Sequence, residues 1–425
     1  MDKIKNFFSK IWKAICSFFV NIFNPFFVKI GKNIWKGLRY VCVPIAKGAS
    51  WLFSFGATKA IASSVICVLI GLLAGFIVML IRDPENCFRG LSVLITSGFS
   101  KKSSISHVLM NMTPMMLAGL SISFAFKLGL FNIGITGQLT MGAFLAFIVS
   151  FNGGNWLACM LVALLGGAAV GAISGILKAK FNVNEVLSGI MLNWIVYYLT
   201  SLIGQQLPSD CIDYYNKAQL AKMGIQGRMP SMFGVDSTFY GVTWGLIIAI
   251  VICLIFFFIL KFTKFGFEMK LCGSNKFAAK YAGINQDQKI ALSLLLSGAI
   301  AGICGYLVFS NPSSPKAFTY NSLDGVMIAD GFNGISVALI GQTDPIGCIF
   351  SAFFINYITE AQTRIVNVSI LYSKYYMELI RAVIVYVASL SALFITLIRR
   401  SNIKHKETID ASFKQLFSRK AKEAK

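Results

Sequence analysis

Five polar side chains interrupt long apolar segments of the chain, and their types and positions suggest contact with a polar solute. They are Asn132, Gln138, Asn193, Asp330 and Asn333. Polar groups are costly in hydrocarbon, so inside an apolar segment they mark either a pathway or a structural need. Their amide and carboxylate groups can hydrogen-bond sugar hydroxyls or base edges, which predicts that they line a substrate pathway. In the alternative, such residues cap broken helices and touch no solute; this stays open for Asn132 and Asn333 and is favoured for Gln138.

Bond-making chemistry is not expected from this sequence. It contains no evident nucleophile–base pair or carboxylate dyad, and Gly-Ile-Thr-Gly-Gln at 134–138 lacks the Gly-Lys-Ser/Thr ending of a nucleotide-binding loop. His107 and His405 have no nearby ligand partners, and the cysteines form no Cys-x-x-Cys pair. We therefore predict no metal, no cofactor and no enzyme activity, so that any ATP driving the protein is hydrolysed by a separate subunit.

The elements that carry these residues are expected to be membrane-spanning helices. The chain is 56% hydrophobic and only 13% charged, whereas soluble domains are about 25% charged. A helix needs about 20 apolar residues to cross the hydrocarbon core, and these stretches predict an all-α integral membrane protein with about ten transmembrane helices. The expected spans are residues 60–81, 106–126, 131–150, 156–177, 186–204, 239–260, 290–309, 326–340, 345–360 and 375–398.

Basic residues gather in three places, at 1–59, 261–289 and 399–425, within a chain of net charge +22. The positive-inside rule places all three clusters, and so both termini, in the cytoplasm. Topology and anionic lipid then explain the charge without a nucleic-acid partner. The predicted organisation is a basic amphipathic extension over 1–59, a transmembrane domain over 60–398 and a basic tail over 399–425. For the extension, a solvated basic tail remains the alternative.

Cys87 and Cys211 fall in the two longest predicted outer loops, and whether they form a disulfide is left open by the sequence.

The basic loop 261–289 contains a short predicted amphipathic helix over 275–281. Asn275 is a good N-cap and Gly283 a good C-terminal stop. The small side chains of Ala278 and Ala279 would let this helix lie closely against the groove of a partner. An ordinary surface helix is the alternative interpretation.

Four segments together resemble the permeases of bacterial ABC importers in the branched-chain amino acid, ribose and nucleoside group. The loop matches the group's coupling pattern Gly-x-Asn-x-x-Ala-Ala-x-x-x-Gly-Ile at Gly273, Asn275, Ala278, Ala279, Gly283 and Ile284. The segments 127–138, 184–193 and 330–339 match in the family's order, and the first is most like the nucleoside and simple-sugar branch. Residues 1–50 are not explained by the resemblance.

The resemblance implies a cobalamin-importer-type permease fold of ten helices, embedded in the lipid of the bacterial cytoplasmic membrane. It also implies three protein partners: a cytoplasmic ABC ATPase that binds the coupling residues, a second permease subunit and an extracytoplasmic substrate-binding lipoprotein. An inverted internal repeat is indicated by Phe-Asn-Ile-Gly at 131–134 and Phe-Asn-Gly-Ile at 332–335.

The predicted function is nucleoside import by an ATP-driven ABC transporter. One alternative is import of ribose, galactose or another simple sugar. A second is an ion-coupled secondary transporter, for which Asp330 is the plausible mid-span carboxylate.

Overall fold

The computed structural model describes residues 69, 71–81, 83–213, 219–313, 318 and 329–365, with a few positions between 378 and 386. These residues belong to one compact unit, residues 63–425. The basic extension 1–59, most of the predicted last span 375–398 and the tail 399–425 lie outside the described residues. The predictions made for them therefore remain predictions.

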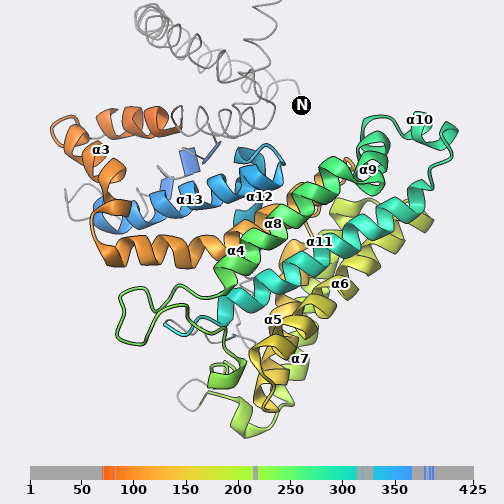
Figure 1. The fold of residues 1–425 in the computed structure, drawn as a ribbon, viewed down its shortest axis with the longest axis horizontal. Coiled ribbons are helices and arrows are strands. Elements are labelled where there is room, and N and C mark those ends of the chain that lie inside the picture. The colour runs from red at the N-terminus through yellow and green to blue at the C-terminus, as the bar shows by residue number, and fades with distance from the viewer. Residues whose placement is uncertain are drawn as a thin grey trace, which may run out of the picture. The chain divides into compact units, whose positions relative to one another are not determined.

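The described part of the chain is helical, with two isolated β-bridges, Ile212–Leu220 and Ser231–Thr243 (Figure 1). After a short apolar helix Gly71–Ile81, the α-helices are α3 (Cys87–Thr96), α4 (Lys102–Phe126), α5 (Ile135–Phe151), α6 (Trp156–Phe181), α7 (Glu185–Gln205), α8 (Gly245–Phe262), α9 (Lys264–Ser274), α10 (Lys276–Tyr281), α11 (Gln286–Phe309), α12 (Ala329–Ile340) and α13 (Pro345–Ile365).

Five of these helices, α4, α6, α7, α8 and α11, are long and apolar enough to cross a membrane. A sixth span is added if α12 and α13, which are bent by 118° at their junction, count as one broken span. With 12 residues, α12 is about 18 Å long, shorter than the hydrocarbon core of about 30 Å. The structure thus supports a multi-pass helical membrane protein.

Two local expectations differ from the structure. The predicted span 239–260 begins six residues late, as α8 at Gly245, because residues 231–243 fold back on themselves through the Ser231–Thr243 bridge. The predicted outer loop after the first span contains the helix α3, since Cys87, Gly90 and Leu94 are buried along one side of it.

Glycines allow α6 and α11 to pack closely along their length. A Cβ atom on Gly298 would lie 2.4 Å from the Gly167 carbonyl oxygen, and one on Gly302 would lie 2.0 Å from the Ala163 carbonyl oxygen. Small residues at such contacts are typical of membrane helices, which associate through close backbone approach. We infer that α6 and α11 form a rigid pair that supports the neighbouring helices.

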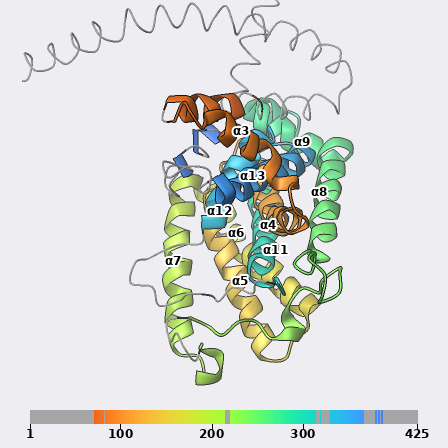
Figure 2. The same ribbon diagram turned by 90° about the vertical axis from the view of Figure 1, so that its left-hand side faces the viewer.

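The outer faces of α7 and α8 carry exposed apolar side chains, as expected where lipid is the solvent. Only 22% of the most apolar part of α8 is buried within the protein. In Figure 2, α7 stands at the edge of the bundle, and Met191, Ile195 and Leu202 on it are exposed.

The possible disulfide is not formed: Cys87 and Cys211 are both free thiols. Cys87 is buried and donates a hydrogen bond to the Pro84 carbonyl, 3.1 Å away.

Candidate functional site

A cavity of about 290 Å³ lies between α4, α11, α12 and α13. Its lining comprises Met110, Asn111, Pro114, Met115, Leu307, Val308, Asn311, Asp330, Asn333, Asn356 and Thr359. Because these residues come from four helices, a relative movement of any one helix changes the shape of the cavity.

The cavity lining combines several hydrogen-bonding groups with an apolar wall. Four carboxamides, one carboxylate and one hydroxyl line it, and no Lys or Arg is among the described lining residues. The Asn311 carboxamide donates to the Gly241 carbonyl at 2.9 Å, and the Asn356 carboxamide donates to the Ala352 carbonyl at 2.8 Å. These bonds orient the two side chains. Such a surface suits an uncharged solute with several hydroxyl or amide groups and disfavours an anion.

The structure places two of the five predicted pathway residues, Asp330 and Asn333, in the cavity wall. Asn111 and Asn356 also line it, and neither is among the five residues predicted from the sequence. Both lie within predicted spans, so the same signal, a carboxamide in an apolar helix, could have found them. Asn311 lies just after the end of α11, where polar residues are common and carry no signal.

The other three predicted pathway residues form a buried cluster where α5 begins. Asn132 and Gln138 are 3% and 0% exposed and pair through their amides, with Asn132 Nδ2 donating to Gln138 Oε1 at 2.8 Å and Gln138 Nε2 donating to Asn132 Oδ1 at 3.2 Å. Asn193 on α7 accepts from the Gly137 N–H at 2.7 Å and donates to the Ile133 carbonyl at 3.0 Å. None of the three lines the cavity, and their bonds match the alternative of holding a broken helix together.

The segment from α9 to α11 confirms the predicted ends of the short helix α10. The Asn275 side chain accepts a hydrogen bond from the Ala278 N–H at 3.1 Å, as an N-cap does. At the other end Gly283 has a φ of +75°. The Ile284 N–H donates to the Ala279 carbonyl and the Gly283 N–H to the Lys280 carbonyl, which is a Schellman motif.

The two faces of α10 have different surroundings. Phe277 and Tyr281 are 78% and 93% exposed, and Ala278 is exposed as well. Ala279 is fully buried in a cluster that includes Met269, Cys272 and Leu294, with Ile284 packed against it. The expectation that both alanines face a partner is therefore wrong for Ala279, because its side of the helix packs against α9 and α11.

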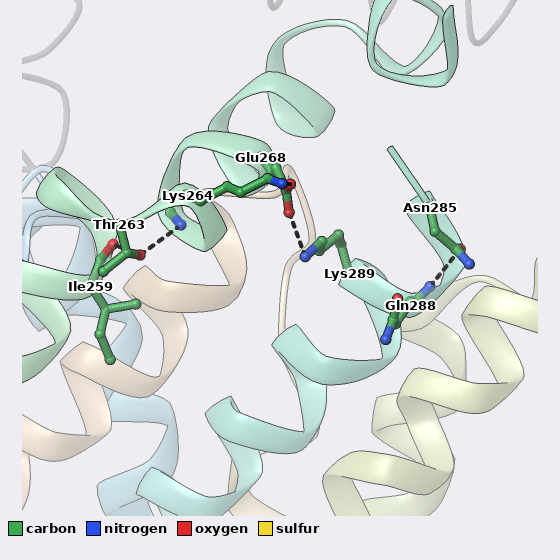
Figure 3. Close-up of polar contacts among 8 residues, drawn as sticks. Ile259, Thr263, Lys264, Glu268, Asn285, Gln288 and Lys289 are labelled. Carbon is green, nitrogen blue, oxygen red and sulfur yellow. Dashed lines mark hydrogen bonds and ion pairs between the residues drawn. The ribbon is translucent and has the colours of Figure 1, made fainter. Parts of the chain in front are cut away.

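Charged and polar contacts attach this segment to the beginning of α11 (Figure 3). Lys289 Nζ lies 2.5 Å from Glu268 Oε2 and 4.8 Å from the centroid of the Phe265 ring. The hydrogen bond from Lys289 holds the pKa of the Glu268 carboxyl below its usual range. The Asn285 side chain caps α11 by accepting from the Gln288 N–H at 3.2 Å. Together these contacts fix α9 and α10 to α11, the helix whose other end reaches the cavity.

Comparison with known proteins agrees with this architecture. The model of the family described as branched-chain amino acid transport system / permease component matches residues 104–401. The guanosine ABC transporter permease protein NupP of Bacillus subtilis is 33% identical over 68% of this chain and 81% of its own length. The nucleoside ABC transporter permease protein NupB of Lactococcus lactis is 32% identical over 73% of this chain and 86% of its own.

A more distant relative carries a sugar in its name. The glucose ABC transporter permease protein TsgB13 of Haloferax volcanii is 28% identical over 71% of this chain and 80% of its own length. No solved structure matches the chain at a significant level.

Proposed function

We propose that this chain, which belongs to the family of permease components of branched-chain amino acid transport systems, is the membrane-spanning subunit of an ATP-driven ABC importer and carries nucleosides. The cavity between α4, α11, α12 and α13 is the solute site in this proposal. The observation that carries it is the lining of four carboxamides and one carboxylate inside a bundle of membrane helices. Ligand pockets commonly combine an apolar wall with a few polar groups that fix orientation.

The charge of the lining bears on the choice of solute within the family. A branched-chain amino acid is a zwitterion, and its carboxylate would find no lysine or arginine partner among the described lining residues. A charge that enters a low-dielectric site without a partner is costly. Nucleosides are uncharged and rich in hydroxyl and amide groups, so the lining favours them over amino acids.

The apolar part of the cavity wall favours nucleosides over simple sugars. Met110, Pro114, Met115 and Leu307 offer a surface for the flat face of a base, which a simple sugar lacks. The names of the relatives NupP and NupB support nucleosides, while the relative TsgB13 supports a sugar as the second candidate. An ion-coupled mechanism has no comparable support from the named relatives.

The ATPase subunit is proposed to bind the exposed face of α10. Phe277 and Tyr281 stand out from the protein on either side of the small, exposed Ala278. Two exposed aromatic side chains around a small one suit insertion into a groove, where aromatic anchors contribute most of the binding energy. In this proposal Gly273, Asn275, Ala279, Gly283 and Ile284 support coupling by shaping and seating the helix.

The remaining parts of the assembly follow from the same proposal. A second permease subunit completes the pathway, and an extracytoplasmic lipoprotein delivers the solute. Lipid covers the exposed apolar faces of α7 and α8. The loop of α9 and α10 and both termini lie in the cytoplasm in this proposal. The cavity opens alternately to the two sides of the cytoplasmic membrane as the ATPase hydrolyses ATP.

Uptake by intact cells tests the proposed function. Cells that express this chain with its partner subunits are expected to accumulate radiolabelled guanosine or uridine, and cells in which this chain is deleted are expected to lose that uptake. Excess unlabelled nucleosides should compete, whereas leucine and glucose should not. Loss of leucine or glucose uptake on deletion, with nucleoside uptake unchanged, would contradict the proposal.

A further inference from the structure

The connection between α4 and α5, residues 127–134, touches the coupling segment at one end. A Cβ atom on Gly273, which lies at the end of α9, would be 2.3 Å from the Lys127 carbonyl oxygen and 3.1 Å from the Leu128 Cα. The two backbones are thus in direct contact. The Lys127 side chain also donates a hydrogen bond to Thr343 Oγ1 at 3.2 Å, in the turn between α12 and α13. A displacement of α9 must therefore move this connection or break the contact.

The same connection is bonded to α4 and α11 through a buried serine pair. Asn132 Nδ2 donates to Ser297 Oγ at 2.7 Å, and Ser297 Oγ donates to the Ser121 carbonyl at 2.7 Å. In return, Ser121 Oγ donates to the Ser297 carbonyl at 2.8 Å. Both serines are 0% exposed and Asn132 is 3% exposed. With water excluded, each of these bonds is costly to lose without replacement, so the three segments shift together.

Beyond the connection, the first turn of α5 contacts α12, the helix that carries Asp330. A Cβ atom on Gly331 would lie 2.6 Å from Thr136 Oγ1, and Asp330, the neighbouring residue, lines the cavity. The Thr136 hydroxyl is buried and has no hydrogen-bond partner in the structure. An unsatisfied buried hydroxyl is uncommon. The close packing of Thr136 against Gly331 links a movement of the connection to α12, the helix that carries Asp330.

We propose that residues 127–134 transmit movement of the coupling segment to the cavity, and that Asn132 is the positioning residue that keeps the connection attached to α11. The sequence leaves open whether Asn132 lines the solute pathway or holds a broken helix together; its hydrogen bonds place it between the coupling segment and Asp330. This inference rests on the proposed function for the identity of the motor, but not for the identity of the solute.

The test measures ATP hydrolysis and solute transport in the same reconstituted complete transporter. Asn132→Leu keeps the branching of the side chain at Cγ and removes its bonds to both Gln138 and Ser297. We expect the ATPase subunit to remain bound and ATP hydrolysis to stay within about twofold of wild type. The amount of solute carried per ATP should fall at least about tenfold, because hydrolysis no longer moves α12.

Ser297→Ala is the second variant, since it removes only a hydroxyl and should fold even where Asn132→Leu does not. It should lower the same ratio, and the double variant should be no worse than the more affected single one, as expected when both act through one contact. Ser174→Ala is the matched control, because the buried Ser174 hydroxyl bonds only within α6, to the Gly171 carbonyl.

An unchanged ratio in Ser297→Ala would overturn the inference, and so would a parallel fall in hydrolysis and transport, which indicates general damage. A wild-type complex that hydrolyses ATP and carries a solute other than a nucleoside would refute the proposed solute. The ratio measured with that solute would still decide the role of Asn132.

Discussion

Lys289 Nζ lies 2.5 Å from Glu268 Oε2, and each side chain is 15% exposed. The pair joins α9 to the first turn of α11, so the segment that carries α10 cannot swing away from α11 without breaking this ion pair.

Reversal of one charge in this pair should detach the ATPase. Glu268→Lys places two cations face to face, and we expect at least about tenfold less ATPase to co-purify with the permease. The double exchange Glu268→Lys with Lys289→Glu should restore most of the binding. Lys222→Ala, at an exposed position outside this segment, is the control. If the double exchange loses as much ATPase as Glu268→Lys alone, the loss does not come from breaking this ion pair.

Because the two faces of α10 have different surroundings, substitution by arginine should have different effects at Ala278 and at Ala279. Ala278→Arg should leave the permease at normal abundance in the membrane and abolish ATPase retention, because the exposed face is blocked. Ala279→Arg should reduce abundance itself, since a buried alanine in contact with α9 and α11 cannot accept a long charged side chain. Immunoblots of membranes and co-purification measure both. If Ala278→Arg binds the ATPase normally, this face is not the docking face.

Asp330 should be required for transport but not for assembly. Asp330→Asn removes the one carboxylate among the described lining residues, and hydrogen bonds to a charged group contribute about 1.5–3 kcal/mol. We expect nucleoside uptake to fall by about tenfold or more with the complex still assembled. Asp236→Asn, at an exposed position before α8, is the control and should leave uptake unchanged. Normal uptake by Asp330→Asn would remove this residue from the solute site.

Gly298 should be intolerant of even one methyl group. In Gly298→Ala the added Cβ would lie 2.4 Å from the Gly167 carbonyl oxygen, and overpacking of this kind costs about 1–3 kcal/mol. The melting temperature of the purified complex should fall by several degrees. Gly234→Ala is the matched control, because its Cβ would meet no atom within 4 Å. Equal melting temperatures for the two variants would contradict the close packing of α6 on α11.

Local chemistry predicted some features of the structure better than others. Asn275 and Gly283 mark the ends of α10 as expected, because caps depend on a few adjacent residues. Polarity within an apolar segment found Asp330 and Asn333 but could not separate them from Asn132, which has the same signal. What separates them is the presence of Ser297 beside Asn132, a contact between residues far apart in the chain.

The burial of Ala279 could not be predicted from the sequence either. A helix of six residues, such as α10, is too short for its apolar pattern to define a buried face. The face is set by Met269 and Leu294, which pack against it from α9 and α11.

Transport by purified components tests the central claim most directly. Proteoliposomes that contain this chain with its partner permease and ATPase, supplied with the binding protein outside and ATP in the lumen, are loaded with radiolabelled guanosine from outside. We predict accumulation that requires luminal ATP and is lost in Asp330→Asn. Accumulation driven by a proton or sodium gradient without ATP, or ATP-dependent uptake of glucose or leucine but not of guanosine, would contradict it.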